Sequence, residues 1–130
     1  MKGSTEGYAP GDLLVIDASA ERRLSKSQTP YSTLVAGIYS TQPGVMASQH
    51  RAGEALPGNE VPLAVVGIVP CKVSAENGPI EAGDLLVTSS TPGHAMKGTD
   101  RSKMLGAVVG KALQPLLGGE GTIQVLVTLQ

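Results

Sequence analysis

Short apolar runs follow one another along the whole chain, separated by clusters of glycine, proline and polar residues. In the last run, TIQVLVTL, every second residue from Ile123 onward is aliphatic, which is typical of a β-strand with one buried face. Turn clusters such as TQPG, ALPGNE and LLGGEG bound the runs. The pattern predicts strands within Asp12–Asp17, Thr33–Tyr39, Pro62–Val73, Asp84–Thr88, Met104–Leu113 and Thr122–Leu129.

Helix is predicted only in short pieces. Ala18–Lys26 has the composition of one or two helical turns, and Ser102–Leu105 that of a single turn. Met104–Leu113 also resembles a helix in composition, but Gly106 and Gly110 weaken helices and its two valines favour a strand. The expected fold class is therefore all-β with little helix.

The pentapeptide GDLLV occurs twice, at Gly11–Val15 and again at Gly83–Val87. Each copy precedes a polar segment, then an apolar run with a central glycine, a turn with proline, and a longer valine-rich strand. These halves, approximately residues 10–73 and 80–130, predict a single β domain over residues 10–130. Its expected form is a small closed or nearly closed barrel with approximate twofold symmetry.

Both copies of the pentapeptide are expected to begin at a turn. Gly11 and Gly83 supply a backbone angle that other residues resist. The side chains of Asp12 and Asp84 are then suited to accept hydrogen bonds from N–H groups of the same turn, so each is interpreted as a turn residue rather than a catalytic acid. Asn77-Gly78 predicts a hairpin turn, because both residues tolerate positive φ.

Composition and charge exclude several classes of function. The net charge is −1, and neither a polybasic run nor aromatic residues interleaved with Lys or Arg are present, so nucleic-acid binding is not expected. No apolar stretch approaches the roughly 20 residues of a membrane helix, so membrane insertion is not expected. The first residues, MKGSTEGYAPG, lack the apolar core of a signal peptide. Residues 1–9 are expected to be an N-terminal tail or the end of an upstream linker.

The reactive side chains form no catalytic or metal-binding pattern. Cys71 lies within an apolar run and is interpreted as a small buried side chain, with Lys72 beside it directed to solvent. His50 and His94 lack the spacing of metal ligands. The Ser89–Ser90 pair is close to His94, but residues so near on one turn rarely adopt nucleophile and base geometry. No catalytic residue, cofactor site or metal site is therefore predicted.

The stretch VPLAVVGIVPCKVSAENGPIEAGDLLVTSSTPGHAMKG, followed by LGAVVGKAL and IQVLVTLQ, resembles a C-terminal domain of bacterial and phage-associated surface proteins. It is similar to the intramolecular-chaperone domains that end phage tail-fibre and neck-appendage proteins, over nearly the whole chain from Gly11 to Gln130. The resemblance implies a β-rich trimerisation module at the end of a longer fibrous chain, on an extracellular surface or a virion. In some relatives the module cleaves itself off after assembly.

Three hypotheses of function follow. The first is a non-enzymatic structural domain that forms homo-oligomers, with trimers expected, and follows upstream domains of a longer chain; Tyr39 and Met46 are its candidate interface residues. The second is a self-processing chaperone or peptidase, for which only Ser4 and Thr5 offer hydroxyls near the N-terminus. The third is a small-ligand or glycan-binding module, although three tyrosines are the only aromatic residues available for stacking.

Overall fold

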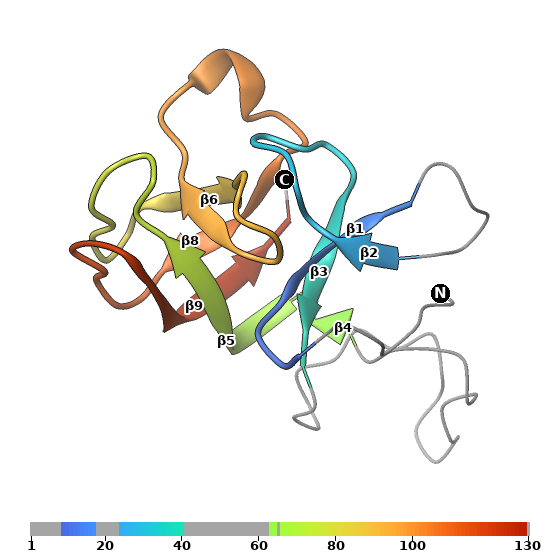
Figure 1. The fold of residues 1–130 in the computed structure, drawn as a ribbon, viewed down its shortest axis with the longest axis horizontal. Coiled ribbons are helices and arrows are strands. Elements are labelled where there is room, and N and C mark those ends of the chain that lie inside the picture. The colour runs from blue at the N-terminus through green and yellow to red at the C-terminus, as the bar shows by residue number, and fades with distance from the viewer. Residues whose placement is uncertain (1–8, 18–23, 41–62, 65, 130) are drawn as a thin grey trace.

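The computed structural model describes residues 9–17, 24–40, 63–64 and 66–129 (Figure 1). These residues confirm the predicted all-β class, since their regular structure is strand apart from one turn of 3-10 helix. The strands are β1 (Leu13–Ile16), β2 (Leu24–Lys26), β3 (Val35–Tyr39), β4 (Leu63–Ala64), β5 (Val66–Ser74), β6 (Leu85–Thr88), β7 (Ala95–Lys97), β8 (Val108–Ala112) and β9 (Glu120–Thr128). The 3-10 helix is Arg101–Lys103.

The strands form two hydrogen-bonded groups. One is a four-stranded sheet in the order β2-β1-β3-β4, and the other is a closed barrel in the order β5-β7-β6-β8-β9. The most extensive pairing in the barrel is the antiparallel one between β5 and β9. In contrast, β5 meets β7 through the single parallel pair of Val73 and Ala95. Because β4 and β5 follow each other along the chain, this stretch belongs first to the sheet and then to the barrel (Figure 1).

The two halves of the sequence share their strand order. The sheet order β2-β1-β3-β4 has the same form as β7-β6-β8-β9 within the barrel. In the first half Leu14 pairs with Gly37, and in the second half Leu86 pairs with Gly110; the register shifts directly after each pair. The two halves therefore share both the pentapeptide sequence and the position of the irregularity in the strand pairing.

Two short strands, β2 and β7, differ from the prediction. Leu24–Lys26 was expected to lie in a helical segment, but it pairs with β1. Leu24 is buried against Leu14 and Ala36, so packing by residues distant in sequence overrides local propensity. Ala95–Lys97 lies in a stretch expected to be a polar excursion, yet Ala95 and Met96 are both buried.

Asn77-Gly78 forms a turn, but not the hairpin that the sequence suggests. Gly78 has φ 108°, and its N–H donates to the carbonyl of Ala75 at 3.0 Å. The strands on either side of the turn are β5 and β6, and β7 lies between them in the barrel. The Asn77 side chain instead donates to the carbonyl of Lys97 (2.8 Å) and to Thr99 Oγ1 (3.1 Å), which ties the turn to the end of β7.

Aliphatic side chains form the core, as the absence of Phe and Trp requires. Leu13 and Ile38 of the first sheet belong to the same buried cluster as the inward-facing residues of the barrel, which joins the two groups of strands. The other members of this cluster are Val69, Cys71, Val73, Leu86, Ala95, Val109, Ala112, Ile123, Val125 and Val127 of the barrel strands, and Ile80, which lies between β5 and β6.

Candidate functional site

The first pentapeptide turn is buried at the junction of the sheet and the barrel. Asp12 is 1% exposed, and its Oδ2 accepts a hydrogen bond from the N–H of Ala9 at 2.7 Å. Lys72 Nζ of β5 lies 2.9 Å from Asp12 Oδ1, and Lys26 Nζ lies 3.7 Å from Oδ2. The prediction that Lys72 points to solvent is therefore wrong, because a buried carboxylate attracts this ammonium group.

A glycine of the second half completes this buried junction. The N–H of Gly93 donates to the carbonyl of Ser27 (3.0 Å), and its own carbonyl accepts from the N–H of Leu13 (2.8 Å). Gly93 has φ 73°, and a Cβ at this position would lie 2.6 Å from Asp12 Oδ1. The loop before β7 thus packs on the first turn through a residue that needs both positive φ and the absence of a side chain.

The second pentapeptide turn repeats the local geometry of the first. Gly11 and Gly83 both have φ 95°. The Oδ2 atom of Asp84 accepts from the N–H of Glu81 at 2.8 Å, and Lys97 Nζ lies 3.9 Å from it, as Lys26 does from Asp12. The surroundings differ, however, because the side chain of Asp84 is 23% exposed.

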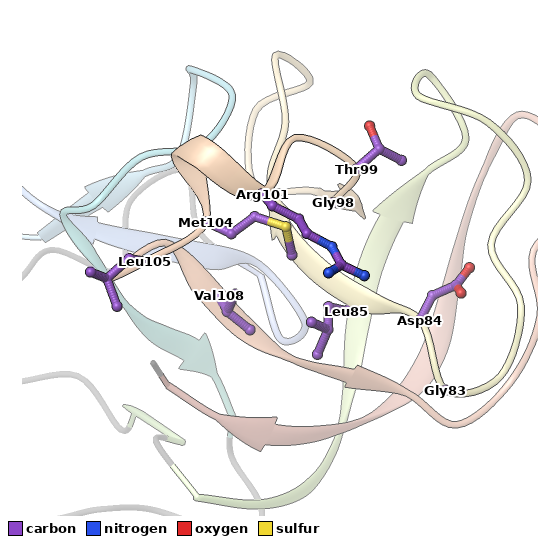
Figure 2. Close-up of a pocket in the computed structure, with 9 residues that line it drawn as sticks. All are labelled: Gly83, Asp84, Leu85, Gly98, Thr99, Arg101, Met104, Leu105 and Val108. Carbon is purple, nitrogen blue, oxygen red and sulfur yellow. The ribbon is translucent and has the colours of Figure 1, made fainter.

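Beside this second turn lies an open hollow of about 680 Å³ (Figure 2). The apolar side chains of Leu85, Met104 and Val108 line it, and Arg101 and Asp84 bring opposite charges to it. Leu105, at its edge, is 92% exposed. Figure 2 shows Arg101 extended above Leu85 in the direction of Asp84, and Leu105 directed away from the hollow. The remaining lining residues are Gly83, Gly98 and Thr99.

The hollow occupies the position that Gly93 fills in the first half. Gly98 N–H donates to the carbonyl of Leu85 at 2.8 Å, just as Ser27 N–H donates to that of Leu13 at 3.0 Å. Leu13 and Ser27 are the two residues that Gly93 bridges, whereas Leu85 and Gly98 both line open space. The second turn is therefore an unfilled counterpart of the junction in the first half.

The serines near His94 form a different network from a nucleophile and its base. Ser90 Oγ donates to Glu76 (2.5 Å), and Ser89 Oγ donates to the carbonyl of His94 (2.7 Å). The ring of His94 instead has Nδ1 2.8 Å from the carbonyl of Pro92. Both hydroxyls thus donate to acceptors other than the His94 ring, and these bonds hold the loop together.

Glu76 anchors the same loop from the other side. Its carboxylate accepts from Ser90 N–H (3.1 Å) and from Thr91 Oγ1 (2.6 Å), in addition to Ser90 Oγ. Burial by itself raises the pKa of Glu76, but the hydrogen bonds from Ser90, Thr91 and Ser74 outweigh it and lower the pKa to about 2. Glu76 is thus held as a carboxylate that links the turn after β5 to the loop that carries Gly93.

Cys71 is fully buried in the barrel. Burial raises the pKa of its thiol to about 12, and the negative charge of Asp12 adds to this effect. A thiol with so high a pKa is protonated near neutral pH, which suits a packing role rather than a nucleophile.

Of the two predicted interface residues, Tyr39 packs beside the buried residues Leu14, Leu24 and Ala36. Met46 lies outside the described residues, as does His50. Within the described part of the chain, no group of three metal-binding side chains occurs and no helix is long and apolar enough to cross a membrane. The positions of Arg101 and Leu105 at the hollow were not predicted from the sequence, although an apolar Met104–Leu105 pair directly follows the basic residues Arg101 and Lys103.

No protein-family model matches the chain, and no curated protein matches it either.

Proposed function

We propose that this chain is a non-enzymatic assembly domain that associates with copies of itself. The observation that carries the proposal is Leu105, 92% exposed beside a hollow with an apolar lining. Burying a leucine side chain stabilises by about 1.5–3 kcal/mol, so an exposed leucine next to unfilled apolar surface favours association. In agreement with the family resemblance, we propose three copies in the assembly and a place on an extracellular surface or a virion.

The first half supports this proposal by showing how the same kind of surface is covered. There, Lys72 and Gly93 cover the turn and leave Asp12 buried. The second turn has the same backbone form and a partly exposed aspartate. A surface built like an internal junction, but open, suits contact with another protein chain.

Light scattering on a sizing column, at several concentrations, tests the proposal. We expect about three times the chain mass of 13.2 kDa, unchanged on moderate dilution. A mass of one chain throughout, at high concentration as well, would refute self-association.

A second candidate, favoured by the size of the hollow, is the binding of a small ligand. Ligand pockets commonly occupy about 300–1,000 Å³ and combine an apolar lining with a few charged groups. The hollow, at about 680 Å³ with Arg101 and Asp84, has this character. If the chain is a monomer, we expect small amphipathic carboxylates to shift the NMR amide signals of Leu85 and Gly98; unchanged signals across such a set would remove this candidate.

A further inference from the structure

We infer that Asn77 is a site of spontaneous deamidation that the folded chain protects, so that its modification marks molecules in which the turn after β5 has opened. Asn77 is followed by Gly78, and a glycine has no side chain to shield its backbone nitrogen from the preceding side-chain amide. Both residues are partly exposed, so water reaches them. The site takes a second role for this turn, separate from the proposed self-association.

The modification joins two atoms of adjacent residues. The backbone nitrogen of Gly78 attacks Cγ of Asn77 and closes a succinimide ring, and the side-chain nitrogen leaves as ammonia with the proton that Gly78 loses. Water then opens the ring at either of its carbonyl groups, which gives aspartate or isoaspartate at position 77. The net change is the exchange of ammonia for water, so no further reactant is needed.

The folded chain engages both nitrogens of this reaction. Nδ2 of Asn77, which must leave, donates to the carbonyl of Lys97 at 2.8 Å and to Oγ1 of Thr99 at 3.1 Å. The backbone nitrogen of Gly78, which must attack, donates to the carbonyl of Ala75 at 3.0 Å. Formation of the ring breaks all three hydrogen bonds, so it proceeds from the small fraction of molecules in which the turn is open.

Further contacts hold this turn closed. The N–H of Ala75 donates to the carbonyl of Gly119 at 2.8 Å, and the carboxylate of Glu76 accepts hydrogen bonds from Ser90 and Thr91. These bonds tie the turn to the loop between β8 and β9 and to the loop before β7. Opening of the turn therefore disturbs contacts with two other loops, which lowers the population of the open state.

The product cannot restore the contact with β7. An aspartate at position 77 has no N–H to donate, so its carboxylate would face the carbonyl oxygen of Lys97 without a hydrogen bond. Its charge also directly follows the carboxylate of Glu76 and repels it. An isoaspartate in addition lengthens the backbone before Gly78, which displaces that residue from Ala75. Deamidation thus converts a transient opening into a lasting loss of the contact.

Peptide mapping by mass spectrometry tests the site on the wild-type chain. Samples are incubated folded and in guanidinium chloride, in the same mildly alkaline buffer, and the aspartate and isoaspartate products of Asn77 are followed over time. We expect conversion in denaturant, and a rate at least about a hundredfold lower in the folded chain, because opening of the turn limits it. Asn59, which precedes Glu60 instead of a glycine, serves as the internal reference for a slow asparagine.

A pair of threonine variants tests the protecting hydrogen bonds. Thr99→Val removes the oxygen that accepts from Asn77 and keeps the shape of the side chain. We expect conversion in the folded chain to be about fivefold faster, because opening then breaks one hydrogen bond fewer. Thr122→Val, at an exposed position of β9, is the matched control and should leave the rate unchanged. In denaturant, both variants should react at the rate of the wild type.

Asn77→Asp reproduces one product and tests its consequence. We expect its thermal unfolding midpoint to be lower by roughly 4 °C, because the donor to Lys97 is replaced by a carboxylate. Gln124→Glu, at an exposed position of β9, exchanges an amide for a carboxylate away from the turn. This control should leave the midpoint unchanged.

Each outcome decides one part of the inference. Absence of conversion in denaturant would overturn the site, and equal rates in the folded and denatured chain would overturn its protection. Equal folded rates for Thr99→Val and Thr122→Val would show that the bonds to β7 do not protect Asn77. An Asn77→Asp midpoint equal to that of the wild type would overturn the lasting loss of contact. Failure of self-association, in contrast, is seen in light scattering and changes none of these results.

Discussion

The two pentapeptide turns have the same local structure and opposite surroundings. In both, a glycine at φ 95° precedes an aspartate that accepts from a backbone N–H three residues earlier. Asp12 is 1% exposed and Asp84 is 23% exposed. The shared pentapeptide sequence thus determines a turn and the start of a strand. The environment of the carboxylate is determined by residues that lie far away in the sequence.

The difference changes what the same aspartate contributes to stability. A buried carboxylate whose partner is removed is strongly destabilising, because its charge then lacks compensation in a medium of low polarity. A partly exposed ion pair contributes little, since water screens it. Matched substitutions at the two turns can therefore separate the effect of the motif from the effect of its surroundings.

The largest expected loss of stability comes from removing the lysine partner of each aspartate. Lys72→Ala should lower the free energy of unfolding by about 3 kcal/mol, at the lower end for a broken buried pair because Lys26 stays near Asp12. Lys97→Ala, at the second turn, should cost less than about 1 kcal/mol. Urea denaturation of both variants measures the two values. Equal losses would show that burial of the first turn has no energetic consequence.

The next largest loss of stability is expected from substituting Gly93, which packs on the first pentapeptide turn. Gly93→Ala should destabilise by about 2–3 kcal/mol, since its Cβ meets Asp12 Oδ1 and an alanine at positive φ costs about 1–2 kcal/mol by itself. Gly83 also has positive φ, at 95°, but no atom lies within 4 Å of the added Cβ. Gly83→Ala should therefore cost only about 1–2 kcal/mol. Thermal unfolding of the two variants measures the difference, and a smaller loss for Gly93→Ala would contradict the close packing.

The smallest expected effect is the contribution of Glu76 to the pH dependence of stability. The pKa of Glu76 is about 2 in the folded chain and ordinarily 4.5, so the folded state favours the carboxylate. Its stabilising contribution is complete above pH 4.5 and is lost as the pH falls towards 2, by about 1 kcal/mol after allowance for solvent screening. Unfolding measured from pH 6 to 2, with Glu76→Gln as the comparison, reports this contribution. The same slope in both proteins would assign the acid sensitivity to other groups.

The sequence predicts the parts of this fold that depend on neighbouring residues. Alternation identified β9, and repetition drew attention to both pentapeptide turns. The three-residue strands β2 and β7 are too short to show a period, and packing across the sheet creates them. The pairing of Lys72 with Asp12 joins residues 60 positions apart, so no local pattern indicates it. The hollow escaped prediction for the same reason, since an empty position beside Asp84 is defined only by comparison with a filled one.

The pairing of β5 with β9 has a consequence for synthesis on the ribosome. The chain emerges from its N-terminus, so the first sheet can assemble while the later strands are still being added. β5 must then wait, with one long edge unpaired, until β9 has left the exit tunnel. Contacts between segments so distant in sequence form slowly. The nascent chain therefore passes through a period in which an apolar strand edge is open to chaperones or to other nascent chains.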